Sequence, residues 1–67
     1  MKEKVVLYFF FADIPRAKKY AVLSEGKRKE NYVKTVVEAE GPQLLQLLVK
    51  EEVQKAERFG GKLVFAS

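Results

Sequence analysis

The fold is decided by one apolar run near the start of the chain, Val5-Val6-Leu7-Tyr8-Phe9-Phe10-Phe11-Ala12. Its β-branched and aromatic side chains favour a strand, which we expect to span Glu3 to Ala12. Alternate side chains of a strand point to opposite faces of a sheet, so Phe9 and Phe10 face opposite ways. Both faces of this strand are therefore apolar, and both need to be covered.

The segment after this strand is open to two interpretations. Asp13-Ile14-Pro15 breaks the strand, because the residue before a proline avoids the helical region and proline favours a turn. We expect Arg16 to Ser24 to form a second strand. A short helix over Ile14 to Val22 is the alternative, since alanine, lysine and arginine are good helix formers. A polar turn follows from Glu25 to Glu30, in which Gly26 can adopt a positive φ.

The second half of the chain has clearer patterns. Asn31 to Glu40 alternates between apolar and polar residues, which is typical of an antiparallel strand with one face in water. Pro42 opens a helix that we expect to end near Phe59, before the glycine pair Gly60-Gly61. The apolar residues of this helix form one stripe: Leu45, Leu48, Val49, Val53, Ala56 and Phe59. A short final strand is expected within residues 62–67.

These elements predict a single α+β domain over residues 1–67. It is a two-layer sandwich with an antiparallel three-strand meander, one helix and a short C-terminal strand, in the order β-β-β-α-β. The helix crossover should place the last strand parallel to a neighbouring strand. One helix covers only one face of the sheet, so the other apolar face requires a partner, either a second copy of the chain or another protein.

The composition narrows the class of protein. The chain has 67 residues, no cysteine and no histidine, so disulfides and ordinary zinc, haem and iron–sulfur sites are excluded. We expect no metal and no cofactor, and we expect association to supply part of the stability of so small a domain. Many lysines and glutamates with few asparagines and glutamines are typical of thermophilic proteins.

The expected location is the cytoplasm. No stretch approaches the roughly 18 apolar residues of a membrane span, so no membrane partner is expected. Lys2 and Lys4 precede an apolar run, as in a signal peptide, but the run is short and no small-residue cleavage site follows it.

The first candidate site is the uncovered sheet face, because exposed apolar patches usually mark contacts. Tyr8 and Phe10 are its expected anchors, since aromatic side chains dominate interface energetics. The full set of expected partner-binding residues is Val6, Tyr8, Phe10, Tyr20, Tyr32 and, on the outer side of the helix, Leu47. The sequence therefore favours a small non-catalytic protein–protein interaction or regulatory module, with a homodimer as the default.

The alternative is a basic nucleic-acid-binding protein, because the net charge is +4 and aromatic side chains can stack on bases. Its candidate residues are Arg16, Lys18, Lys19, Lys27, Arg28, Lys29 and Lys34. In the expected meander, Arg16 and Lys27 lie at opposite ends of one strand, so these residues need not form one patch. The motifs of RNA recognition domains and a G-x-x-G loop are missing, and lysines also protect sheet edges against aggregation.

Catalysis is not expected. Histidine and cysteine, the commonest catalytic groups at neutral pH, are absent, and neither Ser24 nor Ser67 has a conventional base. The carboxylates are typical of a solubilising surface, and no phosphate-binding loop or dinucleotide fingerprint occurs. No small-molecule substrate is evident. A subunit of an oligomeric enzyme with an interfacial site is the second alternative.

Overall fold

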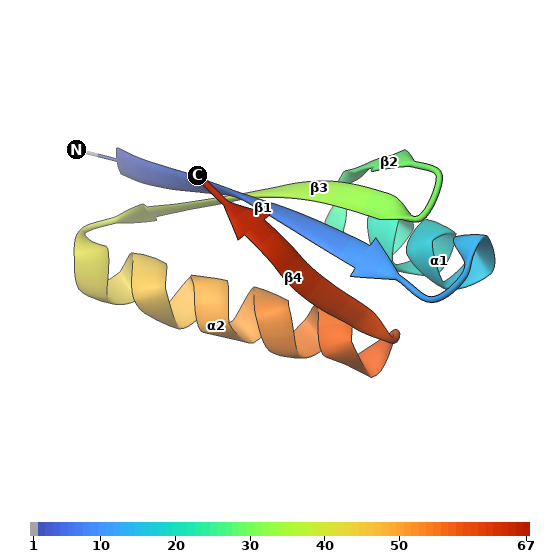
Figure 1. Ribbon diagram of the computed structural model, residues 1–67. Helices are drawn as coiled ribbons and strands as arrows, with labels where there is room; N and C mark the ends of the chain where they lie inside the picture. Colours follow the sequence, from blue (N-terminus) through green and yellow to red (C-terminus); the bar gives the residue numbers. More distant parts are fainter. Residues whose placement is uncertain (1) are drawn as a thin grey trace.

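The structure is a computed structural model that describes residues 2–67 (Figure 1). Its elements are β1 (Lys2–Phe11), α1 (Ile14–Ser24), β2 (Lys27–Lys29), β3 (Tyr32–Glu40), α2 (Pro42–Arg58) and β4 (Gly61–Ala66). The sheet has the strand order β2-β3-β1-β4, and every neighbouring pair is antiparallel. Both helices lie against the same face of the sheet. The predicted α+β two-layer sandwich is confirmed, in the split β-α-β order of a ferredoxin-like topology.

The core lies between the sheet and the two helices. Leu7, Phe9 and Phe11 of β1 are fully buried there, as the strand alternation predicts. Val33 of β3 faces the same side, because it pairs with Phe9 in the register. The predicted stripe of α2 packs on these residues, and its Ala56 is fully buried. The alternate residues of the strands and the apolar stripe of α2 thus pack together in one core.

The expected strand from Arg16 to Ser24 is wrong, and the alternative helix is correct. Asp13 caps this helix, since its Oδ1 accepts a hydrogen bond from the backbone N–H of Arg16 at 2.9 Å. Pro15 stands in the first turn, where its missing N–H has no partner to lose. Ala17, Tyr20 and Ala21 are buried, which is helical spacing rather than alternation.

Because residues 14–24 form the helix α1 and not a strand, the expected three-strand meander does not form. Residues 27–29, expected as part of a turn, form the edge strand β2 and pair with β3. The tight connection between them is Glu30-Asn31, where Glu30 adopts a positive φ of 56°. β4 pairs antiparallel with β1, so the expected parallel pairing is also wrong. The α2 crossover does make β4 parallel to β3, but β1 lies between these two strands.

The helix α2 ends just before the glycine pair Gly60-Gly61, as predicted. Phe59 caps the helix, and Gly60 adopts a φ of +78°. A Cβ atom on Gly61 would lie 2.5 Å from the ring of Phe11, so only glycine lets β4 begin this close to the core.

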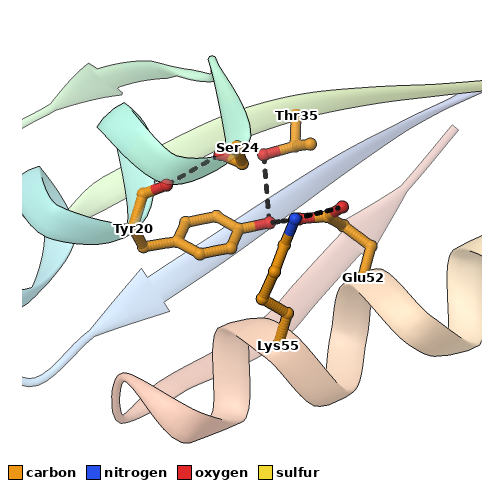
Figure 2. Close-up of polar contacts among 5 residues, drawn as sticks. All are labelled: Tyr20, Ser24, Thr35, Glu52 and Lys55. Carbon is orange, nitrogen blue, oxygen red and sulfur yellow. Dashed lines mark hydrogen bonds and ion pairs between the residues drawn. The ribbon is translucent and has the colours of Figure 1, made fainter.

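Besides the Thr35 hydroxyl, the core encloses the hydroxyl of Tyr20 (Figure 2). It donates a hydrogen bond to Glu52 Oε2 on α2, and it lies 3.2 Å from Thr35 Oγ1 on β3. Because the phenol has one proton, the Thr35 hydroxyl is the donor in the second contact. Lys55 pairs with Glu52 at 3.3 Å. The phenol therefore links α1, β3 and α2. The hydroxyls of Tyr20 and Thr35 and the carboxylate of Glu52 each have a hydrogen-bond partner.

Replacing Tyr20 with phenylalanine should lower the free energy of unfolding by about 1–3 kcal/mol, because Glu52 and Thr35 each lose a partner in a largely water-free site. Tyr32→Phe is the matched control. Tyr32 is half exposed, and its change should stay within about 0.5 kcal/mol. Urea unfolding followed by circular dichroism measures both values, and equal effects of the two substitutions would contradict the linking role of Tyr20.

The stability should also depend on pH in the alkaline range. Burial in the core, and then the hydrogen bond to Glu52, raise the pKa of the Tyr20 phenol above its ordinary value of 10.0. The folded state therefore holds this proton more tightly than the unfolded chain does. This contribution is complete below about pH 10 and is lost as the pH rises further. Unfolding curves between pH 9 and 11.5 should fall more steeply for the native chain than for Tyr20→Phe; parallel curves would refute the assignment.

Candidate functional site: the open sheet face

The sheet face opposite the helices is uncovered, and we call it the open face (Figure 1). Side chains of β1, β3 and β4 reach it in alternation with the buried ones. The register places Phe10 beside Tyr32 and Tyr8 beside Phe65. The ring centroids are 5.2 Å apart in the first pair and 5.6 Å apart in the second. The open face thus carries two aromatic pairs, each made across two neighbouring strands.

These rings are accessible to a ligand. Phe10 is 40% exposed, Tyr32 is 50% exposed and Phe65 is 60% exposed. Tyr8 is half-buried between its neighbours. Apolar rings of this size rarely stay in water on a monomer without a function, because each buries a large area when it is covered.

Lysines border the aromatic pairs. On one side, Lys27 of β2 pairs in register with Lys34, and Lys29 pairs with Tyr32. On the other side, Lys62 of β4 stands opposite Phe10. Among residues 2–67, none of these four lysines takes part in an ion pair. Their ammonium groups are therefore available to an anionic ligand that lies across the rings.

The open face is hollowed beside β2. The hollow has a volume of about 490 Å³ and is lined by Tyr8, Lys27, Arg28, Lys29, Glu30, Tyr32 and Lys34. Arg28 donates a hydrogen bond from Nη1 to the Glu30 carbonyl at 3.0 Å, and it pairs in register with the buried Val33, so its side chain is directed away from the open face. The hollow combines aromatic walls with the three lysines Lys27, Lys29 and Lys34, so its potential is positive.

The far end of the open face has a different charge pattern. Lys4 stands opposite Glu38, and Lys2 stands opposite Glu40, across β1 and β3. Opposite charges in such cross-strand positions compensate each other. The excess positive charge of the open face is therefore concentrated at the β2 end, around the rings of Tyr8 and Tyr32.

The structure separates the expected partner-binding residues into three places. Val6, Tyr8, Phe10 and Tyr32 lie together on the open face. Tyr20 does not: it is fully buried on the helix side, because its segment is a helix and not a strand. Leu47 is exposed on α2, in the other layer of the sandwich.

The expected basic residues are divided by the same helix. Lys27, Arg28, Lys29 and Lys34 line the hollow of the open face. Arg16, Lys18 and Lys19 lie on α1, which covers the opposite face. One basic patch therefore forms from residues 27–34 and excludes the α1 group.

Two residues of the open face were not anticipated, Lys62 and Phe65 of β4. Their spacing does not follow simple alternation, because the register shifts between Tyr8 and Phe9 and leaves Val64 as the additional residue. The only signal in the sequence is an aromatic residue within a short apolar strand. A bulge cannot be located without knowing which strand is the neighbour.

No protein-family model, no curated protein and no solved structure matches the chain. Within residues 2–67, no three or more acidic, histidine or cysteine side chains gather where they could hold a metal ion. No helix in this part of the chain has the length and apolar character needed to cross a membrane. The chemistry of the open face is thus the basis for assigning a function.

Two neighbouring phenylalanines test which face is open. Phe9→Ser removes a fully buried ring and should lower the free energy of unfolding by about 3–5 kcal/mol. This loss is enough to unfold most of the molecules of so small a domain. Phe10→Ser removes an exposed ring and should cost about 1 kcal/mol, the value of its pairing with Tyr32. Thermal melts followed by circular dichroism compare the two. Similar losses for both variants would mean that both faces of β1 are enclosed.

Proposed function

We propose that this protein is a non-catalytic module that binds single-stranded nucleic acid on its open face. The observation that carries the proposal is the interleaving of aromatic rings and free lysines around one hollow. Each component alone has an ordinary explanation, since lysines protect edges and single exposed rings are common. Their combination on one face matches the two chemical features of a nucleic-acid strand, flat bases and charged phosphates.

The aromatic pairs supply the contacts to bases. Stacking of a base on an aromatic side chain contributes about 1–3 kcal/mol and tolerates any base, because every base has a π-face. Tyr32 and Phe65 are the most exposed rings of the two pairs, and they lie on β3 and β4, on either side of β1. A strand that crosses the sheet from β3 to β4 would place successive bases on them.

The lysines supply the contacts to phosphates. Lys27, Lys29 and Lys34 flank Tyr32 on one side, so a backbone whose base stacks on Tyr32 passes within their reach. Lys62 takes the same position on the β4 side. These contacts are independent of sequence and depend strongly on salt, because each releases a counterion.

The aromatic pairs of the open face favour single strands over duplexes. The bases of a duplex are stacked on each other and are unavailable to the rings. Stacking on the rings accepts any base and the lysines bind phosphates, so we expect weak sequence preference.

A second candidate is self-association through the same face. Val36 is half exposed and stands opposite Val6, and with Phe65 these residues form an uncharged strip that a second copy could cover. Face-to-face packing would also bury lysines from both copies, which costs free energy unless carboxylates meet them. We therefore rank this dimer below nucleic-acid binding.

The proposal is tested with a fluorescent 12-nucleotide oligouridine and a hairpin duplex of the same length, at 50 and 200 mM salt. Replacing Lys27, Lys29 and Lys34 with glutamine should reduce the slope of log K against log salt by about two, at roughly 0.7 per lost phosphate contact. Tyr32→Ala should weaken binding about tenfold by removing one stacking platform. The single strand should bind more tightly than the hairpin.

The matched control replaces Lys18, Lys19 and Lys50, which are exposed lysines on the two helices. It makes the same change in net charge and should alter the salt slope little. An equal effect of both triple variants, or no binding at 50 mM salt, would refute the proposal. Sedimentation equilibrium examines the second candidate: a dimer that Phe10→Ser dissociates would favour self-association instead.

A further inference from the structure

β2 covers only part of the edge of β3. It pairs with residues Tyr32 to Lys34, whereas β3 continues to Glu40. From Val36 onward, the structure of residues 2–67 places no strand on that side, and β3 continues past β2 alongside α2 (Figure 1). Alternate residues of such an edge direct their N–H and C=O groups outward, where they can pair with another strand.

A groove of about 500 Å³ follows this free edge, between β3 and α2. Its lining residues are Val36, Val37, Glu38, Leu48, Glu51, Glu52 and Lys55. Leu48 is half-buried and Val37 is buried, so the groove has an apolar floor on the α2 side, and Val36 lies on the open-face side of the free edge. The free edge and the groove together have the form of a site for strand addition.

The charge of the groove is opposite to that of the protein. The chain has a net charge of +4, but the groove has three carboxylates and one lysine. Lys55 is paired with Glu52 at 3.3 Å. Glu38 stands opposite Lys4 on the open-face side of the edge, whereas Glu51 takes part in no ion pair within residues 2–67. An occupant of this groove would therefore be favoured by positive charge.

We propose that the free edge of β3 accepts an extended basic segment of a protein partner as an added strand, in the place where β2 ends. Its backbone pairs with Val36 to Glu40, and its side chains alternate between the two sides of the sheet. A lysine or arginine directed towards α2 lays its aliphatic stem on Leu48 and places its cation near Glu51. An apolar residue directed to the other side covers Val36.

The same charges disfavour one arrangement of a second copy of this chain at the edge. Antiparallel pairing of two β3 edges centred on Glu38 would set the two Glu38 carboxylates directly opposite each other, which is destabilising. The carboxylates of the groove also repel nucleic acid, so the groove and the open face bind ligands of opposite charge. Occupation of the β3 edge is thus independent of the proposed function of the open face.

The probe is a hexapeptide of alternating valine and lysine with blocked ends, titrated into the isotopically labelled protein. Amide shifts should change at residues 36–40 and along the facing side of α2, and the outward amides of this part of β3 should gain protection from hydrogen exchange. Glu51→Lys should weaken binding about fivefold by reversing the charge beside the added strand. Glu57→Lys, an equal change on α2 outside the groove, should leave binding unaltered.

Two modified peptides separate strand addition from simple charge attraction. Methylation of alternate backbone nitrogens removes the ladder donors and should abolish the gain in exchange protection. Replacing the lysines with glutamates should abolish binding. The proposal is overturned if the methylated peptide binds equally well, if the acidic peptide binds, if the shifts lie around the rings of Tyr8 and Tyr32 instead of residues 36–40, or if no binding occurs at millimolar peptide.

Discussion

The helical layer of this protein depends on the buried phenol of Tyr20. Its ring contacts Phe9, Phe11 and Phe59 with centroids 5.4, 5.1 and 6.3 Å away, and its hydroxyl reaches Glu52 and Thr35. A buried hydroxyl is costly unless it is paired, so the two helices and β3 must take the positions that pair it. This requirement places α1 and α2 on the same face of the sheet and leaves the other face open.

The open face results from the placement of both helices on one side of the sheet. With both helices on one side, nothing within residues 2–67 covers Phe10, Tyr32 and Phe65. A sheet with exposed rings is prone to aggregate, and the lysines beside the rings oppose this by repelling further copies. The same lysines attract polyanions. Protection against self-association and attraction of nucleic acid thus have one physical origin, the interleaving of cations with aromatic rings.

Charge is distributed so that the two exposed regions of the sheet differ. The β2 end of the open face has an excess of lysines, whereas the free edge of β3 lies beside Glu38 and Glu51. Both follow from the brevity of β2, which brings Lys27 and Lys29 to the open face and then ends, exposing the rest of β3. A three-residue strand therefore defines both a basic surface and an acidic groove.

The sequence by itself determined the strands β1 and β3, the helix α2 with its buried stripe, and which residues of β1 share a face. These features depend on local periodicity, which the chain carries whatever its neighbours are. It also determined that Tyr8, Phe10 and Tyr32 would be candidates, because they fall between the buried positions. The segment from Ile14 to Ser24 could be predicted only as two alternatives, since its alanines, lysines and arginine favour a helix while the break at Asp13-Ile14-Pro15 also fits a turn between two strands.

Only the tertiary structure decided the rest. Burial of Tyr20 against three other rings selects the helix for that segment, removes Tyr20 from the open face, and separates the lysines of α1 from those of β2. The places of Phe65 and Lys62 depend on a register shift against β1, which is a property of two strands together. Which side chains meet on a sheet is set by pairing between distant segments, and periodicity within one segment contains no information about its neighbour.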